Sequence, residues 1–599
     1  MRNAHILALL LLLLAATAFA IPSQTQNCAK GDVWTGATHD GPALLPKVCT
    51  YTAQDGTPTP GTVRTVPAGT SVDTILATAQ CGDVIELKAG ATYPSFTVPN
   101  KSCDAAHWIQ IRVETPDNSL PPSGSRINPS YAGVASLPDR PSYSGGTSNV
   151  MARITTAATS PAPPAITFAA GASHYRIGPG LEITRPAGVG GIKMLIQAAN
   201  TDHVIIDRNW CHGSPRFEET TRCVFVSGAT HFAFIGNYAN DFKCIAHVGL
   251  CSDSQVLSGG DGLLSQPEFA WTIYNNFLEA AGENILFGGS RRGNRVPTDI
   301  YIFANHFYKP PSWQPCPSGV CYAVKNAFEM KNGSRALVED NLIEYSWGGH
   351  SQSGYAFLLT VRGAWAHVEN VTIRYNHISH VGSIMTLAST RVCHNHGAPT
   401  GRCPTYWEDS GGAGSYSIHD LLFDDVSAAR YAGNAASLID SAFLRKPPLH
   451  DVALDHITVI TNGVEGKILF LGTKGGNPQP KMGPFTMTNS IVLTGLYGGI
   501  WDVGKAFVCA VDQKPVASFN RCFTSYHVAG NLVIGWDTSI WGSWPAGNGF
   551  PQDPGSVFQT YKTYDGDYHV NSPLLSAAID GREPGADIDG LTAHLAGVE

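Results

Sequence analysis

The chain has 599 residues, of which 43% are hydrophobic and only 14% are charged, with 63 glycines and 39 prolines. This composition is typical of a protein rich in strands and loops, and it excludes a mainly helical or coiled-coil chain. The formal net charge of −8, without any basic run, argues against nucleic acid as a partner.

Residues 1–20 have the pattern of a secretory signal peptide. Arg2 gives the positive start, residues 6–14 form the apolar core, and Ala18-Phe-Ala20 provides a cleavage site. No other segment has about 18 consecutive apolar residues, so the sequence predicts no membrane span. We therefore expect a mature protein that is secreted, either extracellular or periplasmic, with no membrane partner.

The next segments divide the chain into an arm, a solenoid and a C-terminal segment. Residues 21–61 predict an extended N-terminal arm, and residues 62–540 predict the solenoid. A short amphipathic helix within residues 67–80, capped by Thr70 or Ser71, is expected to cover the open end of the first coil. Residues 115–165, rich in Pro, Ser and Gly, predict an excursion from an early coil. Residues 541–599 lose the repeat and are expected to pack on the solenoid or to close its end.

A repeated phrase, an apolar residue followed three positions later by Asn, indicates the fold of the central region. The repeated residues are Asn209, Asn237, Asn276, Asn305, Asn341, Asn376 and Asn531. Weaker copies fall at 422–425, where Asp424 and Asp425 would occupy the repeated position, at 454–457, and at 487–490. Short apolar strands separated by turn formers lie between the copies, and tight hairpin signals are infrequent, which favours a β-helix over a propeller.

The Asn has a physical role in such a coil. It tolerates the left-handed backbone region at a sharp turn. Its side-chain amide can also bond to the same Asn one coil away, because coils stack at about 4.8 Å. The sequence therefore predicts an all-β, right-handed parallel β-helix with a structural column of stacked Asn residues.

Fourteen cysteines in a secreted chain predict disulfides between sequence neighbours. Neighbour pairing suits a solenoid, since distant residues lie many coils apart. The expected pairs are Cys28/Cys49, Cys81/Cys103, Cys211/Cys223, Cys244/Cys251, Cys316/Cys321, Cys393/Cys403 and Cys509/Cys522. The stretch from Cys393 to Cys403, with His394 and His396, could instead bind zinc.

The helix followed by Gly82-Asp-Val-Ile-Glu-Leu87 and by Asn-centred coils resembles the pectate-lyase-like superfamily of right-handed parallel β-helices. Within that superfamily, residues 253–362 look like a group of secreted bacterial β-helix proteins, through the phrases at 282–289, 305–310 and 325–332. The resemblance implies an extracellular or cell-wall polysaccharide as partner. The chondroitinase B and alginate lyase group carries Glu-Ile-x-Ser-x-Lys in a comparable coil. Here Glu283 is followed by Gly288 where that Lys would stand.

Strand alternation predicts a charged group on one face of the solenoid. It places Lys325, Ala327, Glu329 and Lys331 outward, and Asn326, Phe328 and Met330 inward. Coils one step away would bring Glu283, Arg362, Asp253 and Gln255 alongside, with His306 and Lys309 at the rim. We expect a mixed-charge groove from these residues.

The candidate chemistry follows from the residue types. Uronate cleavage by β-elimination needs a cation near the carboxylate and a base near C5, and Lys331 and Arg362 fit those roles. Glu283 and Glu329 could instead be a hydrolase pair. Asp253, Gln255, His306, Lys309 and Lys325 would bind substrate. An outward Lys331 should cost little stability to replace.

Three hypotheses remain open from the sequence. The protein is a polysaccharide lyase or glycoside hydrolase, a non-catalytic glycan-binding or adhesion module, or a structural extracellular solenoid. A solvent-facing tryptophan among Trp271, Trp313, Trp347 and Trp365 would support glycan contact. The sequence assigns no metal ligand and leaves open whether a cofactor such as calcium is used.

Overall fold

The structure, a computed structural model, describes residues 27–599 apart from 147, 160, 247–250, 252, 263–265, 291–292, 315–319, 351, 364, 389–390, 394–406, 410, 434–437, 444–447, 463–466, 473–480, 495–498, 503–508, 511–513 and 599. The expected signal peptide and the two histidines of the alternative zinc site lie outside the described residues.

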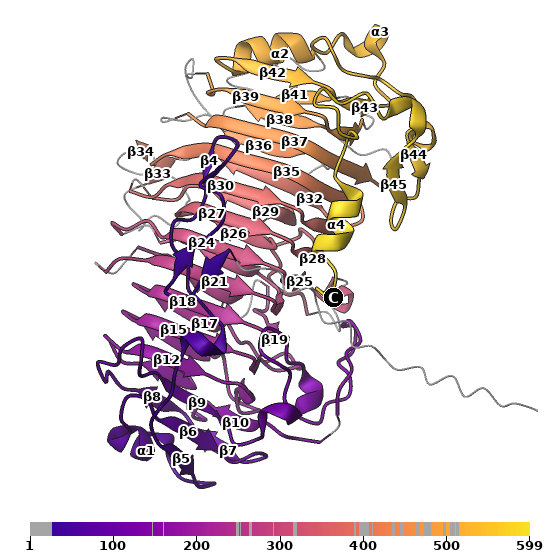
Figure 1. Ribbon diagram of the computed structural model, residues 1–599. Coiled ribbons are helices and arrows are strands. Elements are labelled where there is room, and N and C mark those ends of the chain that lie inside the picture. The colour runs from indigo at the N-terminus through magenta and orange to yellow at the C-terminus, as the bar shows by residue number, and fades with distance from the viewer. Residues whose placement is uncertain are drawn as a thin grey trace, which may run out of the picture.

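The chain forms the predicted right-handed parallel β-helix, with three strands in a typical coil. One strand of each coil belongs to a 12-stranded sheet and the other two belong to a continuous 25-stranded sheet. Figure 1 shows the coils stacked from α1 (Val72–Thr78) at one end to α2 (Pro515–Cys522) at the other. Because successive coils pair strand on strand in parallel, their apolar side chains form one continuous interior.

The 12-stranded sheet consists of β8 (Phe96–Val98), β11 (Ile166–Phe168), β14 (Ile196–Ala199), β17 (Arg222–Ser227), β20 (Gln255–Gly259), β23 (Glu283–Phe287), β26 (Phe328–Met330), β29 (Tyr355–Thr360), β32 (Ser383–Ala388), β36 (Ile439–Phe443), β38 (Leu469–Gly472) and β41 (Ile500–Asp502).

The 25-stranded sheet consists of β5 (Val63–Val66), β6 (Val84–Leu87), β7 (Thr92–Pro94), β9 (Ile109–Val113), β10 (Ala152–Thr155), β12 (Ser173–Ile177), β13 (Leu181–Thr184), β15 (Asp202–Asp207), β16 (Trp210–His212), β18 (Thr230–Ile235), β19 (Tyr238–Phe242), β21 (Phe269–Tyr274), β22 (Phe277–Ala280), β24 (Thr298–Phe303), β25 (His306–Tyr308), β27 (Gly333–Glu339), β28 (Leu342–Ser346), β30 (Val368–Arg374), β31 (His377–Val381), β35 (Ala413–Val426), β37 (His450–Thr461), β39 (Phe485–Thr488), β40 (Ile491–Leu493), β42 (Tyr526–Ala529) and β43 (Leu532–Ile534).

The repeated Asn residues are stacked in one turn column. Asn276 donates from its side chain to Asn305 Oδ1 at 2.9 Å, and Asn305 donates to Asn341 at 3.0 Å. The same bond continues from Asn209 to Asn237 and Asn276, and from Asn341 to Asn376. The left-handed backbone belongs to the preceding residue, such as Ala304 at φ 54°, and not to the Asn itself. The predicted column is thus confirmed, whereas the conformational reason given for Asn is wrong.

The weaker copies of the phrase occupy the column only in part. Ser490 lies in it, since its hydroxyl accepts from Ile457 N and its own N–H donates to Asn531. Asp424 does not, because it pairs with Ser379 in the β31–β35 ladder. The column position in that coil is Leu421, which pairs with Ile457. With apolar residues there, the two strands flanking the turn merge into the single long strands β35 and β37.

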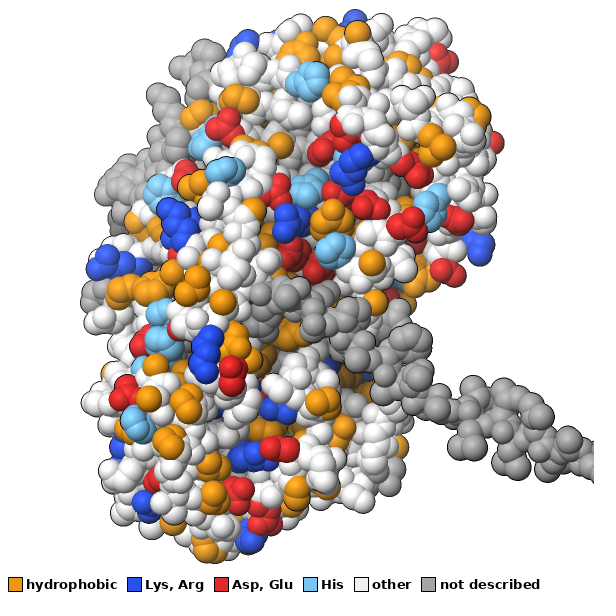
Figure 2. All heavy atoms as spheres, in the orientation of Figure 1, with side chains coloured by type: hydrophobic (Ala, Val, Ile, Leu, Met, Phe, Trp, Pro, Cys, Tyr) orange, Lys and Arg blue, Asp and Glu red, His pale blue; other side chains and the backbone are white. Residues whose placement is uncertain are grey.

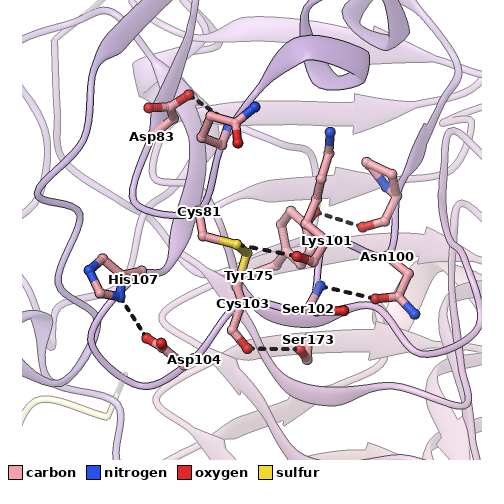
Figure 3. Close-up of a disulfide and its surroundings, with 12 residues drawn as sticks. Cys81, Asp83, Asn100, Lys101, Ser102, Cys103, Asp104, His107, Ser173 and Tyr175 are labelled. Atoms are coloured by element: carbon pink, nitrogen blue, oxygen red, sulfur yellow. Dashed lines mark hydrogen bonds and ion pairs between the residues drawn. A yellow bond between two sulfur atoms is a disulfide. The ribbon is translucent and has the colours of Figure 1, made fainter.

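The helix α1 lies on the first coil. Ser71 caps it by accepting from Asp73 N at 3.2 Å, and the buried Val72 and Leu76 face the interior. The Cys81–Cys103 disulfide then joins the turn after α1 to the loop after β8 (Figure 3). Nearby, the Tyr175 hydroxyl donates to Pro99 O at 2.6 Å. Helix, disulfide and hydrogen bond together fix this end of the solenoid.

Residues 27–60, here called the N-terminal strap, run along the outside of the 25-stranded sheet (Figure 1). The strap contains β1 (Cys28–Ala29), β2 (Val33–Trp34), β3 (His39–Asp40) and β4 (Ala43–Leu44). Asp40 pairs with Arg374 Nη1 at 2.8 Å and with His419 Nε2 at 3.0 Å. Towards the first coils, Asp32 pairs with His203 Nε2 at 3.1 Å. The strap therefore bridges coils that are more than 200 residues apart in sequence.

The C-terminal segment runs back along the solenoid. It contains α3 (Thr538–Trp541), β44 (Phe558–Thr560), β45 (Asp567–Val570) and α4 (Ile588–His594). Tyr568 donates to Asp424 at 2.6 Å, and His594 pairs with Asp340 at 2.9 Å. Outside the two sheets, β33 (Arg391–Cys393) and β34 (Trp407–Asp409) form an antiparallel pair.

Five of the seven expected disulfides are present: Cys28–Cys49, Cys81–Cys103, Cys211–Cys223, Cys244–Cys251 and Cys509–Cys522. The remaining two pairs include Cys316 and Cys403, which lie outside the described residues. Among the described helices, none is both long and apolar enough to cross a membrane.

Figure 2 shows acidic side chains interspersed with Lys, Arg and His over the face in view.

Candidate functional site

The structure brings seven of the nine candidate residues together on the 12-stranded sheet. In the strand register, Gln255 of β20 pairs with Glu283 of β23, and Leu286 of β23 pairs with Glu329 of β26. Asp253 and Lys325 lie just before β20 and β26, and Lys331 and Arg362 lie just after β26 and β29. Four adjacent coils thus supply the charged group.

Two sets of ion pairs connect these side chains. Lys325 Nζ lies 3.0 Å from Asp253 Oδ1 and 3.8 Å from Glu283 Oε1. Gln255 donates to the other oxygen of Glu283 at 2.8 Å. The second set is the Lys331 ammonium in contact with the Glu329 carboxylate. Both buried glutamates are therefore anchored by polar partners, as buried carboxylates require.

Lys331 and Arg362 are held side by side by the backbone. Arg362 N donates to Lys331 O at 3.0 Å, and Lys331 N donates to Phe287 O at 2.7 Å. The coil carrying Lys331 approaches Gly288 so closely that a Cβ there would lie 2.7 Å from Asn332 Cβ. Gly288 also has a φ of 87°, so both space and conformation require glycine. Gly288 stands where the lyase-type phrase has Lys. It thus permits the close approach of the next coil, which carries Lys331.

Burial and neighbouring charge shift the titration of three groups. Burial and the negative charge of Glu283 raise the pKa of Asp253 to about 7. Burial opposes the shift of Glu283, but its hydrogen bond with Asp253 and the charges of Lys325 and Lys331 lower its pKa to about 2. Burial and the positive charge of Arg362 lower the pKa of Lys331 to about 8, and the negative charge of Glu283 only partly opposes that shift. At neutral pH the group thus holds an ionised Glu283, a partly protonated Asp253 and an amine that can lose its proton.

The group is mostly enclosed. The side chains of Glu283 and Glu329 are 1% and 0% exposed, and those of Lys331 and Lys325 are 13% and 15% exposed. Asp253 is the most accessible of the five, with 35% of its side chain exposed. A ligand would therefore meet Asp253, Lys325, Lys331 and Arg362, while the glutamates set the charge beneath them.

Two candidates do not belong to the group. Lys309 is completely buried, and its ammonium donates to Ala280 O, Gly282 O, Asn284 Oδ1 and Asn326 O at 2.8–3.0 Å. His306 is 1% exposed and pairs with Glu344 at 2.7 Å. Their expected place at a solvent-facing rim is wrong, because His306 begins β25 and Lys309 follows its last residue, and both side chains satisfy buried acceptors there.

The predicted alternation around β26 holds over only three residues. Phe328 and Met330 are in the core and Glu329 faces outward, as expected. Beyond the strand, however, Ala327 is in the core, and the Asn326 amide donates to Glu329 Oε2 at 2.8 Å. The period of two fails there because β26 spans only Phe328–Met330, and the chain turns at both ends.

Sequence reasoning missed Arg222. It pairs in register with Gln255, lies in the same column as Glu283, and interacts electrostatically with Asp253 and Glu283. Its position at the start of an apolar strand, Cys223 to Val226, was the available signal. A charged residue that opens one strand of a β-helix lies beside the residues that open the next strands.

The tryptophans do not form a sugar-stacking platform. Trp271 is 0% exposed in the core, and Trp313 and Trp347 are buried beneath loops. Trp365 is partly buried and packs against Gly262 and Gly293. The packing interpretation of these residues is therefore the better one.

Three groups among the described residues have the donor types and spacing of a metal site, and none includes the charged group above. Asp32, His203 and His231 form one, and His174, Asp202 and His203 form another. The imidazoles of His203 and His231 are stacked at 4.1 Å, an arrangement that aims their ring nitrogens parallel rather than at a shared ion. In the third group, Cys244 and Cys251 are joined as a disulfide.

The comparisons with known proteins find structural likeness only. No protein-family model matches the sequence, and no curated protein is similar to it. A PL6-family alginate lyase matches with 13% identity over 88% of this chain and 58% of that chain, at a TM-score of 0.38. An exopolygalacturonase from Yersinia enterocolitica has 8% identity over 78% of each chain, at 0.33. A surface adhesin of Streptococcus pneumoniae has 9% identity over 75% of this chain and 82% of that chain, at 0.32.

Proposed function

We propose that the protein is a secreted polysaccharide-active enzyme that cleaves uronate-containing glycans by β-elimination. The observation that carries the proposal is the pairing of Lys331, whose pKa is lowered to about 8, with Arg362 one coil away. A lysine of that pKa is a competent base near neutral pH, because a useful fraction of the amine is neutral. Arginine matches the geometry of a uronate carboxylate.

The proposed step uses the residues in four roles. Arg362 binds the uronate carboxylate and makes the C5 proton more acidic. The neutral Lys331 amine takes that proton, the C4–O bond breaks, and a C4=C5 double bond forms in the new chain end. The departing oxygen takes up a proton from Asp253, whose pKa near 7 leaves part of it protonated. Lys325, between Asp253 and Glu283, keeps the ionised Glu283 neutralised throughout.

A hydrolytic function has weaker support from the same residues. Asp253 and Glu283 have the split titration of an acid and an ionised carboxylate. The two are hydrogen-bonded to each other, whereas glycosidase pairs stand about 5 Å or more apart to admit a sugar or a water. Glu329 is fully buried against Lys331 and Asn326. No pair of carboxylates in the group therefore flanks a space for a glycosidic bond.

The test is incubation of the mature protein with a panel of uronic-acid polysaccharides, while the absorbance of the unsaturated product is followed. We expect absorbance to rise with at least one polysaccharide, and to rise at least 100-fold more slowly with Arg362→Ala, as for the loss of a transition-state contact. The release of new reducing sugar ends without a rise in that absorbance would indicate hydrolysis instead. Binding without any new ends would leave only a glycan-binding role for the charged group.

A further inference from the structure

Arg222 lies beside the charged group but takes no part in the proposed elimination step. It is the first residue of β17 and pairs in register with Gln255 of the next coil. Its carbonyl oxygen accepts from Leu195 N of the previous coil at 3.0 Å. The adjacent Cys223 is joined to Cys211 by a disulfide. The backbone at Arg222 is therefore fixed on both sides, and only its side chain is left to adapt to a ligand.

The guanidinium of Arg222 is partly buried without a paired anion. Among the described residues, no side-chain hydrogen bond or ion pair reaches it, and its Nε is buried without a partner. Burial lowers the pKa of Arg222, and the charges of Asp253 and Glu283 only partly offset that shift. Arginine nevertheless stays charged in proteins, and buried charges normally have a hydrogen-bonded partner. An anion from outside the chain would supply the missing partner.

A ligand can reach this guanidinium. Arg222 keeps partial exposure, and its two terminal nitrogens are not among the enclosed atoms. The guanidinium carbon lies 5.8 Å from the centre of the Phe225 ring. That contact covers one face of the planar group and leaves its in-plane N–H donors free. Phe225 is itself partly exposed, because it lies outside the core that holds Val224 and Val226. An aromatic ring beside a carboxylate-binding fork suits a sugar that carries a carboxylate.

The distance between Arg222 and Lys331 sets the length of glycan that can touch both. Strands β17, β20, β23 and β26 are successive in the 12-stranded sheet. Arg222 therefore lies three coils from Lys331, about 14 Å along the axis at about 4.8 Å per coil. A pyranose unit of an extended glycan is comparable in length to one coil spacing. A glycan lying along the solenoid would thus reach Arg222 with the unit about three positions from the one at Lys331.

We infer that Arg222 is a second carboxylate-binding residue, which holds another uronate of the same glycan chain about three units from the cleaved one. The inference rests on the proposed function and specifies its substrate as a polyuronate, in preference to a glycan with isolated uronate units. Arg222 positions the chain and moves no proton. Its loss should therefore weaken binding of long chains and leave the chemical step unchanged.

The test measures the binding of di- and hexasaccharides of galacturonate, mannuronate and guluronate by calorimetry. The protein is the double variant Lys331→Met with Glu329→Gln, which lacks the proposed base and leaves the ligands intact. In this background Arg222→Gln should weaken binding of a hexasaccharide about tenfold, because one charge-assisted hydrogen bond is lost. Binding of the disaccharide should not change, since it is too short to span both residues. Arg222→Lys should keep part of the affinity.

Kinetics and stability separate positioning from a structural role. With Lys331 in place, Arg222→Gln should raise KM for the hexasaccharide about tenfold while kcat stays within about twofold. The urea midpoint should stay the same or rise slightly, because a partly buried charge without a partner is removed. The matched control is Arg153→Gln in β10, which removes the same charge from the 25-stranded sheet, where the Arg153 side chain is 50% exposed. It should change neither binding nor KM.

Three outcomes would overturn the inference. In the first, Arg222→Gln weakens di- and hexasaccharides equally, or no more than Arg153→Gln does. In the second, it lowers the urea midpoint and keeps hexasaccharide affinity, so Arg222 serves only to compensate Asp253 and Glu283. In the third, no uronate oligomer binds. Length-dependent binding through Arg222 without any unsaturated product would support the subsite and refute the elimination, so the two failures stay distinguishable.

Discussion

Replacing Lys331 separates a structural role from a chemical one. Its outward position in the sequence predicts a negligible stability cost for Lys331→Ala. The structure predicts otherwise, because the partner, Glu329, is 0% exposed and would lose its cation. Breaking a buried ion pair by removing one partner typically costs 3–5 kcal/mol. Asn326 still donates to Glu329, so we expect a loss of about 3 kcal/mol in the free energy of unfolding.

A double variant isolates the chemistry. In Lys331→Met with Glu329→Gln, both charges are gone and the shapes are nearly kept, so stability should return to within about 1 kcal/mol of the wild type. Cleavage should remain at least 100-fold slower, because a positioned base contributes about 10²–10⁴-fold. Urea unfolding measures the first quantity, and the absorbance of the unsaturated product measures the second.

Two outcomes would refute this reasoning. If Lys331→Ala unfolds at the same urea concentration as the wild type, Glu329 does not need Lys331 in the folded state. If the stable double variant cleaves at the wild-type rate, Lys331 is not the base, and the proposed mechanism is wrong whatever the stability result.

Three further predictions concern pH and the fold. The pKa values of Lys331 and Asp253, about 8 and about 7, predict a bell-shaped pH profile of kcat/KM with its maximum between pH 7 and 8, and Asp253→Asn should remove the fall on the alkaline side. Asn305→Ala should lower the free energy of unfolding by about 3 kcal/mol in urea titrations, because Asn276 loses its acceptor inside the turn column, whereas the exposed Asn118→Ala should change it by less than about 0.5 kcal/mol. Although burial opposes the shift, hydrogen bonds to Asp202 and Asp32 raise the pKa of His203 to about 9. Protonated His203 therefore contributes to the free energy of unfolding below pH 6.5, and this contribution is lost as the pH rises through 9. The urea midpoint should fall over that pH range, and it should fall less in His203→Gln.

Much of the fold could be predicted from the sequence, because each coil of a solenoid is formed by a short segment and the pattern of residues repeats from coil to coil. The Asn column, the apolar strands between its members and the neighbour disulfides each depend on residues close in sequence. The repeat of the Asn phrase also gave a wrong prediction where its copies were weakest. Asp424 and Asp425 were placed in the column from a phrase that only resembles it, and Leu421, with no polar signature, occupies that position.

The candidate site was predictable where it follows the coil repeat. Glu283, Glu329, Lys331 and Arg362 lie near strand ends of successive coils, so their convergence follows from stacking alone. His306 and Lys309 could not be placed that way. Whether a residue at a turn faces solvent or fills a buried polar gap depends on which carbonyls of other coils point at it. For Lys309 these are four acceptors within 3.0 Å, from residues 280–326.

The parallel β-helix and most residues of the charged group could be inferred from the amino-acid sequence, since both follow from a short repeat along the chain. The enclosure of the charged group, the lowered pKa of Lys331 and the course of the N-terminal strap became visible only in the folded chain. The reason is that burial and charge depend on distances between coils and between chain segments hundreds of residues apart. Asp40 meets Arg374 and His419 across more than 330 residues, a contact that no local pattern encodes.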